Sequence, residues 1–264
     1  MAPRERFSSI ATAAREAAAF ARQGWLLRHD AREPVLPSGV DHGDDVVVLL
    51  HGLFATAGVL RPLRASLARS RADAERPGPA KVHPRVHTAT FPYFPGPGIE
   101  ELASRLATVL RAIPAGARIH LVGHSLGGIV ARLCAMQIAD PRVAQTISMA
   151  SPFAGVPRAG LLAIASTRDL EPTSPVLRRI LCSSCASPVP HLSIVAGADT
   201  LVRSPIAHAL PGGEVLVMHG RGHNTLLFDD EVATVVERRI HARRRELVAQ
   251  ASRPVESDRR AHVG

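Results

Sequence analysis

The sequence predicts an α/β protein in which a mostly parallel central sheet has helices on both faces. Strand-like and helix-like segments alternate along most of the 264 residues, an order typical of parallel sheets whose strands are joined by crossover helices. The run Val46–Leu50 contains only valine and leucine, as expected for a strand buried on both faces. In addition, Ser125 lies between glycines, after a strand-like and before a helix-like segment.

The strands are recognised by short runs rich in β-branched and other apolar residues, bounded by glycine, proline or polar residues. The first of them ends at His51-Gly52, and the third leads directly into Ser125. The expected strands are 46–50, 80–91, 118–122, 143–149, 191–196 and 214–218.

The helices are recognised by apolar residues three and four positions apart. Ile99, Leu102 and Leu106 follow this spacing, and acidic residues near the start of the same segment complement the helix dipole. The segment 129–139 is almost entirely apolar and ends before Pro141, which is typical of a buried helix. The expected helices are 60–67, 99–113, 129–139 and 226–248.

The chain is long enough for one large domain with a core of its own. We expect an N-terminal helical segment and linker over 1–40 and the main domain over 41–250. Within that domain, the Pro- and Ser-rich segment of about 151–190 is expected to form a small cap excursion over the sheet. The basic tail 251–264 is expected to be disordered and solvated.

The alanine-rich segment 10–27 bears on localisation. Arg15, Glu16 and Arg22 interrupt it, whereas a signal peptide needs about 7 to 15 continuous apolar residues. We therefore expect an amphipathic helix that lies on the domain or on a membrane surface. No run reaches the roughly 18 to 20 apolar residues of a membrane span. A cytoplasmic protein, or one peripheral to a membrane through this helix, is expected.

The formal net charge is +9, and basic proteins attract phosphate groups. The cations are scattered along the chain, however, and nearly all are arginine, with Lys81 the only lysine. A specific nucleic-acid partner is therefore not expected.

The cysteines offer little chemistry. An odd count of 3 argues against a disulfide framework. Cys182 and Cys185 form a C-x-x-C pair, but a zinc site needs a second pair of ligands and a redox motif needs a thioredoxin-like setting. We expect a local disulfide or two free thiols there, and Cys134 as a small core residue. Neither a metal nor an organic cofactor is predicted.

The run Gly123-His124-Ser125-Leu126-Gly127 is the strongest functional signal. A serine on a sharp turn between a strand and a helix has its oxygen exposed at the carboxyl end of the sheet, and glycines let the backbone pass closely. Ser125 is therefore the candidate nucleophile, and the Leu126 N–H is the first candidate donor to an oxyanion. The second candidate donor is the Leu53 N–H, with the Phe54 N–H as the alternative, because both residues follow the strand 46–50 and the turn residue Gly52.

A carboxylate and a base follow later strands. Asp199 comes directly after 191–196, and His223 follows 214–218 after a glycine-containing loop. Asp169 and Asp140 compete with Asp199, and His219 competes with His223. The other side chains beside these turns that we expect to line a substrate pocket are His51, Phe54, His124 and Phe153.

With these segments in place, the chain resembles the lipase/esterase branch of the α/β-hydrolase superfamily, especially bacterial triacylglycerol lipases and GPI inositol-deacylase-like hydrolases. The matching segments are Val48–Leu53, Leu121–Gly128, Asp199 and Gly222-His223, in the order Ser, Asp, His that this superfamily uses. Ala150–Pro157 is also similar, although phenylalanine stands at position 153 where the family commonly has histidine.

The resemblance implies an α/β-hydrolase fold and cleavage of a small-molecule ester or lipid through an acyl-enzyme on Ser125, with Asp199 and His223 completing a triad. A thioesterase or an acyltransferase would use the same three residues. A non-catalytic binding protein on this fold is the alternative from another class. The sequence does not predict an oligomeric state.

Overall fold

The structure, a computed structural model, describes residues 3–30, 32–74, 84–94 and 96–252. In these residues one 6-stranded sheet runs in the order β2-β1-β3-β4-β5-β6, and every neighbouring pair is parallel. The prediction of an α/β protein with a mostly parallel sheet is confirmed. The strands are β1 (Asp45–Leu50), β2 (Val86–Phe91), β3 (Arg118–His124), β4 (Val143–Met149), β5 (His191–Ala196) and β6 (Glu214–Met218).

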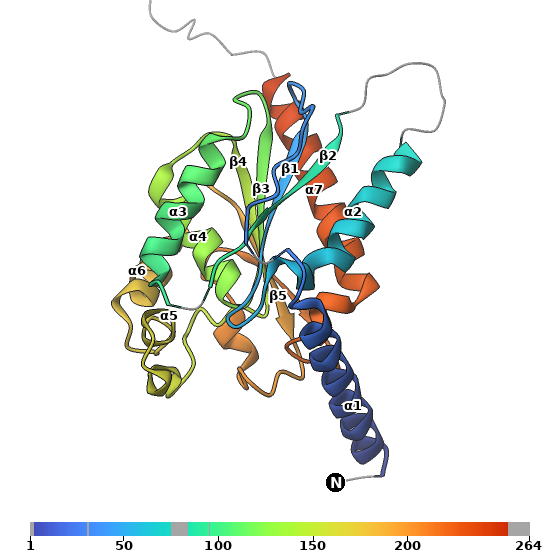
Figure 1. The fold of residues 1–264 in the computed structure, drawn as a ribbon, viewed down its shortest axis with the longest axis vertical. Helices are drawn as coiled ribbons and strands as arrows, with labels where there is room; N and C mark the ends of the chain where they lie inside the picture. Colours follow the sequence, from blue (N-terminus) through green and yellow to red (C-terminus); the bar gives the residue numbers. More distant parts are fainter. Residues whose placement is uncertain (1–2, 31, 75–83, 95, 253–264) are drawn as a thin grey trace, which may run out of the picture.

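Helices cover both faces of the sheet (Figure 1). α3 and α4 lie on one face, whereas α2 and α7 lie on the other, as two separate apolar clusters of buried side chains require. The helices are α1 (Pro3–Leu26), α2 (Arg61–Ala74), α3 (Ile99–Arg111), α4 (Leu126–Ile138), α5 (Ala165–Arg168), α6 (Pro175–Ser183) and α7 (Asp230–Ala251).

Several observed bounds differ from the expected ones. β2 begins at Val86 rather than at 80, with 80–83 outside the described residues, and α2 continues to Ala74 rather than ending at 67. β4, β5 and β6 have the predicted bounds. The helix expected from residue 129 begins at Leu126, because the chain turns sharply at Ser125. α7 begins at Asp230 rather than at 226, since the carboxylate of Asp229 accepts the N–H groups of Glu231 and Val232 and caps the helix there.

The strand order explains where a site can form. The chain passes from β1 to the edge strand β2 and then returns to β3 on the other side of β1. The connections after β1 and β3 therefore diverge, and they leave a crevice at the carboxyl ends of these two strands. His51-Gly52 follows β1 and Ser125 follows β3, so both predicted motifs lie at this crevice.

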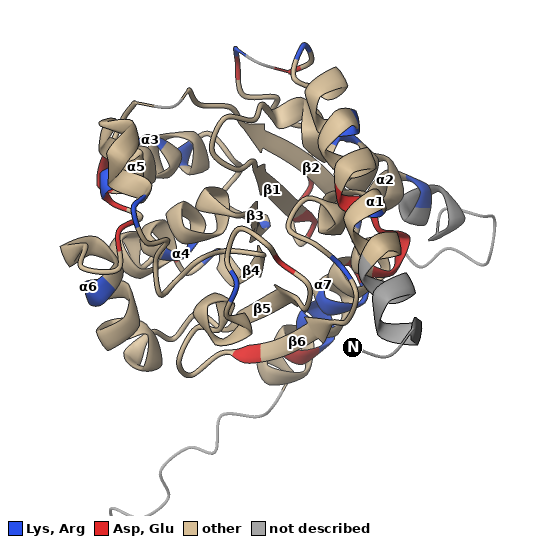
Figure 2. Cartoon of the chain, turned by 90° about the horizontal axis from the view of Figure 1, so that it is seen from below, with Lys and Arg blue, Asp and Glu red and all other residues tan. Residues whose placement is uncertain are grey.

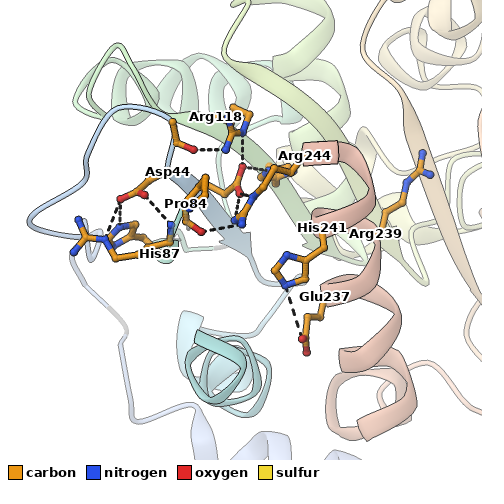
Figure 3. A network of polar contacts seen from close by, with 12 residues as sticks. Asp44, Pro84, His87, Arg118, Glu237, Arg239, His241 and Arg244 are labelled. Atoms are coloured by element: carbon orange, nitrogen blue, oxygen red, sulfur yellow. Dashed lines mark hydrogen bonds and ion pairs between the residues drawn. The ribbon is translucent and has the colours of Figure 1, made fainter. Parts of the chain in front are cut away.

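The opposite end of the sheet is held by a buried polar network (Figure 3). Asp45, which is fully buried, accepts hydrogen bonds from Nε2 of His120 at 3.0 Å and from Nε of Arg118 at 2.8 Å, and Arg244 of α7 binds its other oxygen. Burial alone would raise the pKa of Asp45, but His120, Arg118 and Arg244 hold it at about 2. This carboxylate joins β1, β3 and α7 at the end of the sheet that lies away from Ser125.

The N-terminal segment forms a long helix, α1, whose first turns point away from the sheet (Figure 1). The end of the helix is fixed to the domain, because the Thr56 hydroxyl donates to the backbone oxygens of Leu27 and His29. No helix in the described part of the chain is long and apolar enough to cross a membrane. Membrane contact through α1 stays a prediction. The tail expected to be disordered, 251–264, begins within the described residues, where Ala251 is the last residue of α7, and its residues 253–264 lie outside them.

Charged residues are scattered over several helices and loops rather than gathered in one basic stripe (Figure 2). The cysteines are free thiols: Cys134 is buried and Cys182 and Cys185 are exposed. Of the two alternatives expected for the C-x-x-C pair, the structure therefore has two free thiols. Burial raises the pKa of Cys134 to about 12, so this thiol is a core group.

Part of the segment 151–190, which was expected to form a cap excursion, packs into the hydrophobic core. In α6 the side chains of Val176, Leu177 and Ile180 are buried in the same apolar cluster as α3 and α4. The earlier part of the segment, 152–170, passes over the carboxyl end of the sheet instead and contributes to the pocket described below.

Candidate active site

Ser125 lies on a sharp turn between β3 and α4. Its backbone has φ 54° and ψ −122°, a conformation that side-chain-bearing residues rarely adopt. The surrounding structure holds it: the Ser125 N–H donates to the Met149 carbonyl at 2.8 Å. A Cβ atom at Gly123 would lie 2.3 Å from the backbone of Gly127, so the close approach requires glycine there. The predicted strand–turn–helix setting of Ser125 is therefore present.

The loop after β1 passes beside this turn. A Cβ atom at Gly52 would lie 3.1 Å from Cβ of Ser125, which shows how closely the two turns approach each other. Leu53 comes next in the loop and lines the same pocket as Ser125. Leu126 is the first residue of α4, where a backbone N–H has no acceptor within its own helix.

Asp199 and His223 form a buried pair. Nδ1 of His223 lies 2.7 Å from Oδ2 of Asp199, and Oδ1 of the same carboxylate accepts the N–H groups of Leu201 and Val202, each at 2.8 Å. Burial alone would raise the pKa of Asp199, but the hydrogen bond and charge of His223 and the Val202 N–H lower it below its ordinary value. The carboxylate is therefore ionised and can only accept, so Nδ1 carries the proton. In the neutral ring, Nε2 is left with a free lone pair.

The ring of His124 supports the His223 loop. Its Nε2 lies 3.0 Å from the backbone oxygen of His223, and a carbonyl can only accept, so Nε2 donates. The two imidazole rings are in edge contact, with centroids 4.9 Å apart. Burial, together with the charge of His223, lowers the pKa of His124 to about 3, so this ring stays neutral.

A pocket of about 410 Å³ opens beside Ser125. Ser125, His223, His124 and Leu53 all contribute to its wall, together with α1 and the segment 152–170. Apolar residues make up most of the remaining wall: Phe20, Leu27, Phe54, Pro152, Val156, Ala159, Leu162, Leu170 and Leu201. A pocket of this size and polarity is typical of small-molecule sites.

The competing residues lie elsewhere in the molecule. Asp169 caps α3, because its Oδ2 accepts the Ile99 N–H at 2.7 Å. Asp140 is paired with Arg142 at 2.7 Å. His219 is exposed at the end of β6.

Two of the four expected pocket residues are not among those that line the pocket. Phe153 is fully buried, with its ring in edge contact with His191 at 5.3 Å between centroids. His51 is buried behind the loop, where its ring stacks on Tyr93 and its Nε2 accepts the Tyr93 N–H at 3.1 Å. Phe54 and His124 do line the pocket. Some residues next to the sequence motifs thus line the pocket, whereas others are buried in the core beneath it.

The comparison with known families agrees with this geometry. A sequence model of the alpha/beta hydrolase family matches residues 47–186, more than half of the chain. The chain belongs to the α/β-hydrolase family. The match begins within β1 and ends before β5, and it includes the Gly52 loop and Ser125. No curated protein sequence matches the chain significantly.

Solved structures of lipolytic enzymes and esterases superpose on most of the chain. One is a metagenome-derived lipolytic enzyme at 17% identity, with a TM-score of 0.59, covering 84% of this chain and 99% of that one. A carboxylesterase of the thaumarchaeon Nitrososphaera gargenis has 12% identity and a TM-score of 0.58, covering 81% and 94%. A thermophilic esterase of Thermogutta terrifontis has 17% identity and a TM-score of 0.54, covering 80% and 93%. At these identities the likeness shows the fold.

Some residues at this α/β-hydrolase site were not predicted from the sequence. His208 is buried beside the carboxylate, with its Nε2 at 3.6 Å from Oδ2 of Asp199 and donating to the Val202 oxygen at 3.2 Å. Glu16 and Phe20 of α1 also reach the site. No motif surrounds these three residues, and only the fold brings them to the site. Among the described residues, no three His, Cys, Asp or Glu side chains are grouped so as to hold a metal ion.

Proposed function

We propose that this α/β-hydrolase cleaves carboxylic esters through an acyl-enzyme on Ser125. One observation carries the proposal: a serine on a strained strand-to-helix turn shares an apolar pocket with His223, whose Nδ1 is bound to the ionised, buried Asp199. These are the parts that nucleophilic catalysis by serine needs, namely a nucleophile, a base with a free ring nitrogen and a carboxylate that holds the base.

In the first half of the reaction, Nε2 of His223 takes the hydroxyl proton as Oγ of Ser125 attacks the ester carbonyl. The carbonyl oxygen becomes an oxyanion, which the N–H groups of Leu53 and Leu126 stabilise; such donors are worth about 2.7 to 4 kcal/mol each. The tetrahedral intermediate then collapses. The alcohol leaves with the proton from His223, and the acyl group stays on Ser125.

In the second half, water replaces the alcohol. His223 removes a proton from water, the hydroxide attacks the acyl carbonyl, and the same two N–H groups stabilise the new oxyanion. The bond from the carbonyl carbon to Oγ breaks, Ser125 regains its proton from His223, and the carboxylic acid is released. Asp199 keeps the ring in the required tautomer in both halves.

An ester with an apolar acyl group fits the site best. The side chains of Phe20, Leu162 and Leu201 at the pocket are more than half exposed, and an apolar chain bound there would remove them from water. The lipolytic, carboxylesterase and esterase neighbours support the same class of substrate for this chain. We therefore place it in the lipase/esterase branch of the family.

Hydrolysis of p-nitrophenyl esters from acetate to dodecanoate, by the wild type beside Ser125→Ala, tests the proposal. We expect turnover by the wild type that Ser125→Ala reduces by about 10⁴-fold or more, and labelling of Ser125 by a fluorophosphonate. A wild-type protein that neither turns over any ester nor takes the label would be a non-catalytic binding protein.

The same serine could pass its acyl group to another acceptor or take it from a thioester. Adding an alcohol to the ester assay distinguishes these activities, because an acyltransferase forms a new ester in preference to the free acid. Comparing an acyl thioester with the oxygen ester of the same chain length tests the thioesterase alternative.

A further inference from the structure

The first helix of the chain reaches the loop that carries His223. Oε1 of Glu16 accepts the Asn224 backbone N–H at 2.7 Å and its side-chain amide at 2.9 Å. Oε2 accepts the Thr225 backbone N–H at 3.0 Å and its hydroxyl at 2.7 Å. An ionised carboxylate has about four acceptor positions, so this short piece of chain saturates Glu16.

The same carboxylate also approaches the chain before His223. A Cβ atom at Gly222 would lie 2.3 Å from Oε2 of Glu16, so any larger residue at position 222 would displace the carboxylate. Glu16 thus binds the chain after His223 and leaves no room for a side chain at the residue before it.

α1 is itself held firmly enough to serve as a support. The guanidinium of Arg22 lies over the ring of Phe228, 4.7 Å from its centroid. Beyond the helix, Asp30 is paired with Arg61 at 2.9 Å and with Arg64 at 3.2 Å. Glu16 therefore projects from an element that the domain fixes at further points.

The adjoining face of α1 lines the pocket. Phe20, Gln23 and Gly24 of α1, and Leu27 directly after it, belong to the wall around Ser125. One helix thus contacts both the substrate space and the loop of the base, although it lies about a hundred residues before the serine in the sequence.

We propose that Glu16 is a positioning residue for His223, and that α1 is therefore required for full activity of the site. This inference rests on the proposed function, in which His223 is the base. The backbone oxygen of His223 accepts a hydrogen bond from His124. The backbone N–H groups of the next two residues donate to Glu16. Ester hydrolysis needs Nε2 of His223 within hydrogen-bonding reach of the serine, and a displacement of about 1 Å costs on the order of 100-fold in rate.

Glu16→Gln is the appropriate variant because it keeps the size of the side chain. The amide has only one acceptor oxygen, and its NH₂ group would face N–H donors of the loop. We expect kcat for p-nitrophenyl octanoate to fall about 10- to 100-fold, while KM stays within about twofold. The matched control is Glu33→Gln, the same change at an exposed position after α1, which should leave both constants unchanged.

Phe20→Ala supplies the contrast on the same helix. Since Phe20 lines the pocket without contacting the His223 loop through a hydrogen bond, we expect this change to raise KM for octanoate several-fold, with kcat retained. If Glu16→Gln instead raises KM as Phe20→Ala does, α1 has merely left the pocket and Glu16 is not a positioning residue.

A double-mutant cycle with Thr225→Val tests the contact itself, because valine removes the hydroxyl donor to Oε2. The effects of Glu16→Gln and Thr225→Val on kcat should be non-additive, whereas those of Glu33→Gln and Thr225→Val should add. Additive effects in the first pair would overturn the proposal.

A measurement that does not depend on ester turnover tests the positioning role of Glu16 separately from the proposed esterase activity. In Ser125→Ala protein, the low-field proton resonance of Nδ1–H of His223 reports its hydrogen bond to Asp199. Adding Glu16→Gln should broaden or shift this resonance, and adding Glu33→Gln should not. An unchanged resonance contradicts the positioning role of Glu16, whatever the ester assay shows.

Discussion

His124 donates a hydrogen bond from Nε2 to the backbone oxygen of His223, over 3.0 Å. The donor is the residue immediately before Ser125, so the turn that presents the candidate nucleophile also holds the loop of the candidate base. The residue at the first variable position of the Gly-x-Ser-x-Gly run thus stabilises the loop of the candidate base.

His124→Phe should reduce kcat by about 10-fold or more, because phenylalanine fills the same space but cannot donate to the His223 carbonyl. KM should change little. Steady-state kinetics with p-nitrophenyl butyrate measure both constants, and His219→Phe, a change at an exposed position, is the control. Equal loss of activity in the two variants would contradict this role of His124.

Asp199→Asn should lower kcat by on the order of 10³- to 10⁴-fold, because an asparagine that donates its amide to the ring leaves the wrong nitrogen protonated. Asp169→Asn should keep nearly full activity, since that carboxylate caps α3 and its loss costs only about 1 kcal/mol of stability. Kinetics and thermal unfolding of both variants check the assignment. The reverse result would make Asp169 the orienting acid.

Leu162→Ala should lower kcat/KM for long acyl chains about 3- to 10-fold, because Leu162 lines the pocket and is only partly covered without substrate. The value for p-nitrophenyl acetate should hardly change. Leu161→Ala is a matched control, since the neighbouring side chain is 80% exposed and is not part of the pocket wall. A loss that is independent of chain length would argue against an acyl site here.

Asp45 should make the fold sensitive to acid. Its pKa of about 2 lies below the ordinary value of 3.8, so the stability that it contributes is present above about pH 4 and is lost as the pH falls towards 2. The shift corresponds to about 2 kcal/mol.

Asp45→Asn should therefore lower the free energy of unfolding by about 3 kcal/mol at pH 7, because it leaves Arg118 and Arg244 without their anion. At pH 2 the difference from the wild type should be smaller. Urea unfolding at both pH values measures it, with the exposed Asp41→Asn as the control. A loss of the same size at both pH values would mean that the charge of Asp45 does not matter.

The alternation of strands and helices was predictable because it depends on local patterns. Buried parallel strands such as β1 need apolar residues on both faces, and α3 needs an apolar stripe of helical period, so each element is visible in a short window of sequence. The setting of Ser125 was predictable for the same reason, since strand, turn and helix are consecutive. The start of α7 was misplaced because the cap at Asp229 outweighs the apolar residues before it.

The division between pocket and core could not be predicted. Phe153 and Phe54 each follow a strand, yet Phe153 is fully buried and Phe54 lines the pocket. The difference depends on which elements pack over each ring, and that information is not local.

The sequence by itself thus determined the class of fold, the strained serine turn and the order in which Ser125, Asp199 and His223 occur. The tertiary structure alone decided what surrounds them. Glu16 reaches the chain next to His223 across a separation of 208 residues from Asn224, and His208 reaches Asp199 without any motif. The physical reason is that propensity and hydrophobic period act over a few residues, whereas these contacts exist only after the sheet has closed and α1 has packed against it.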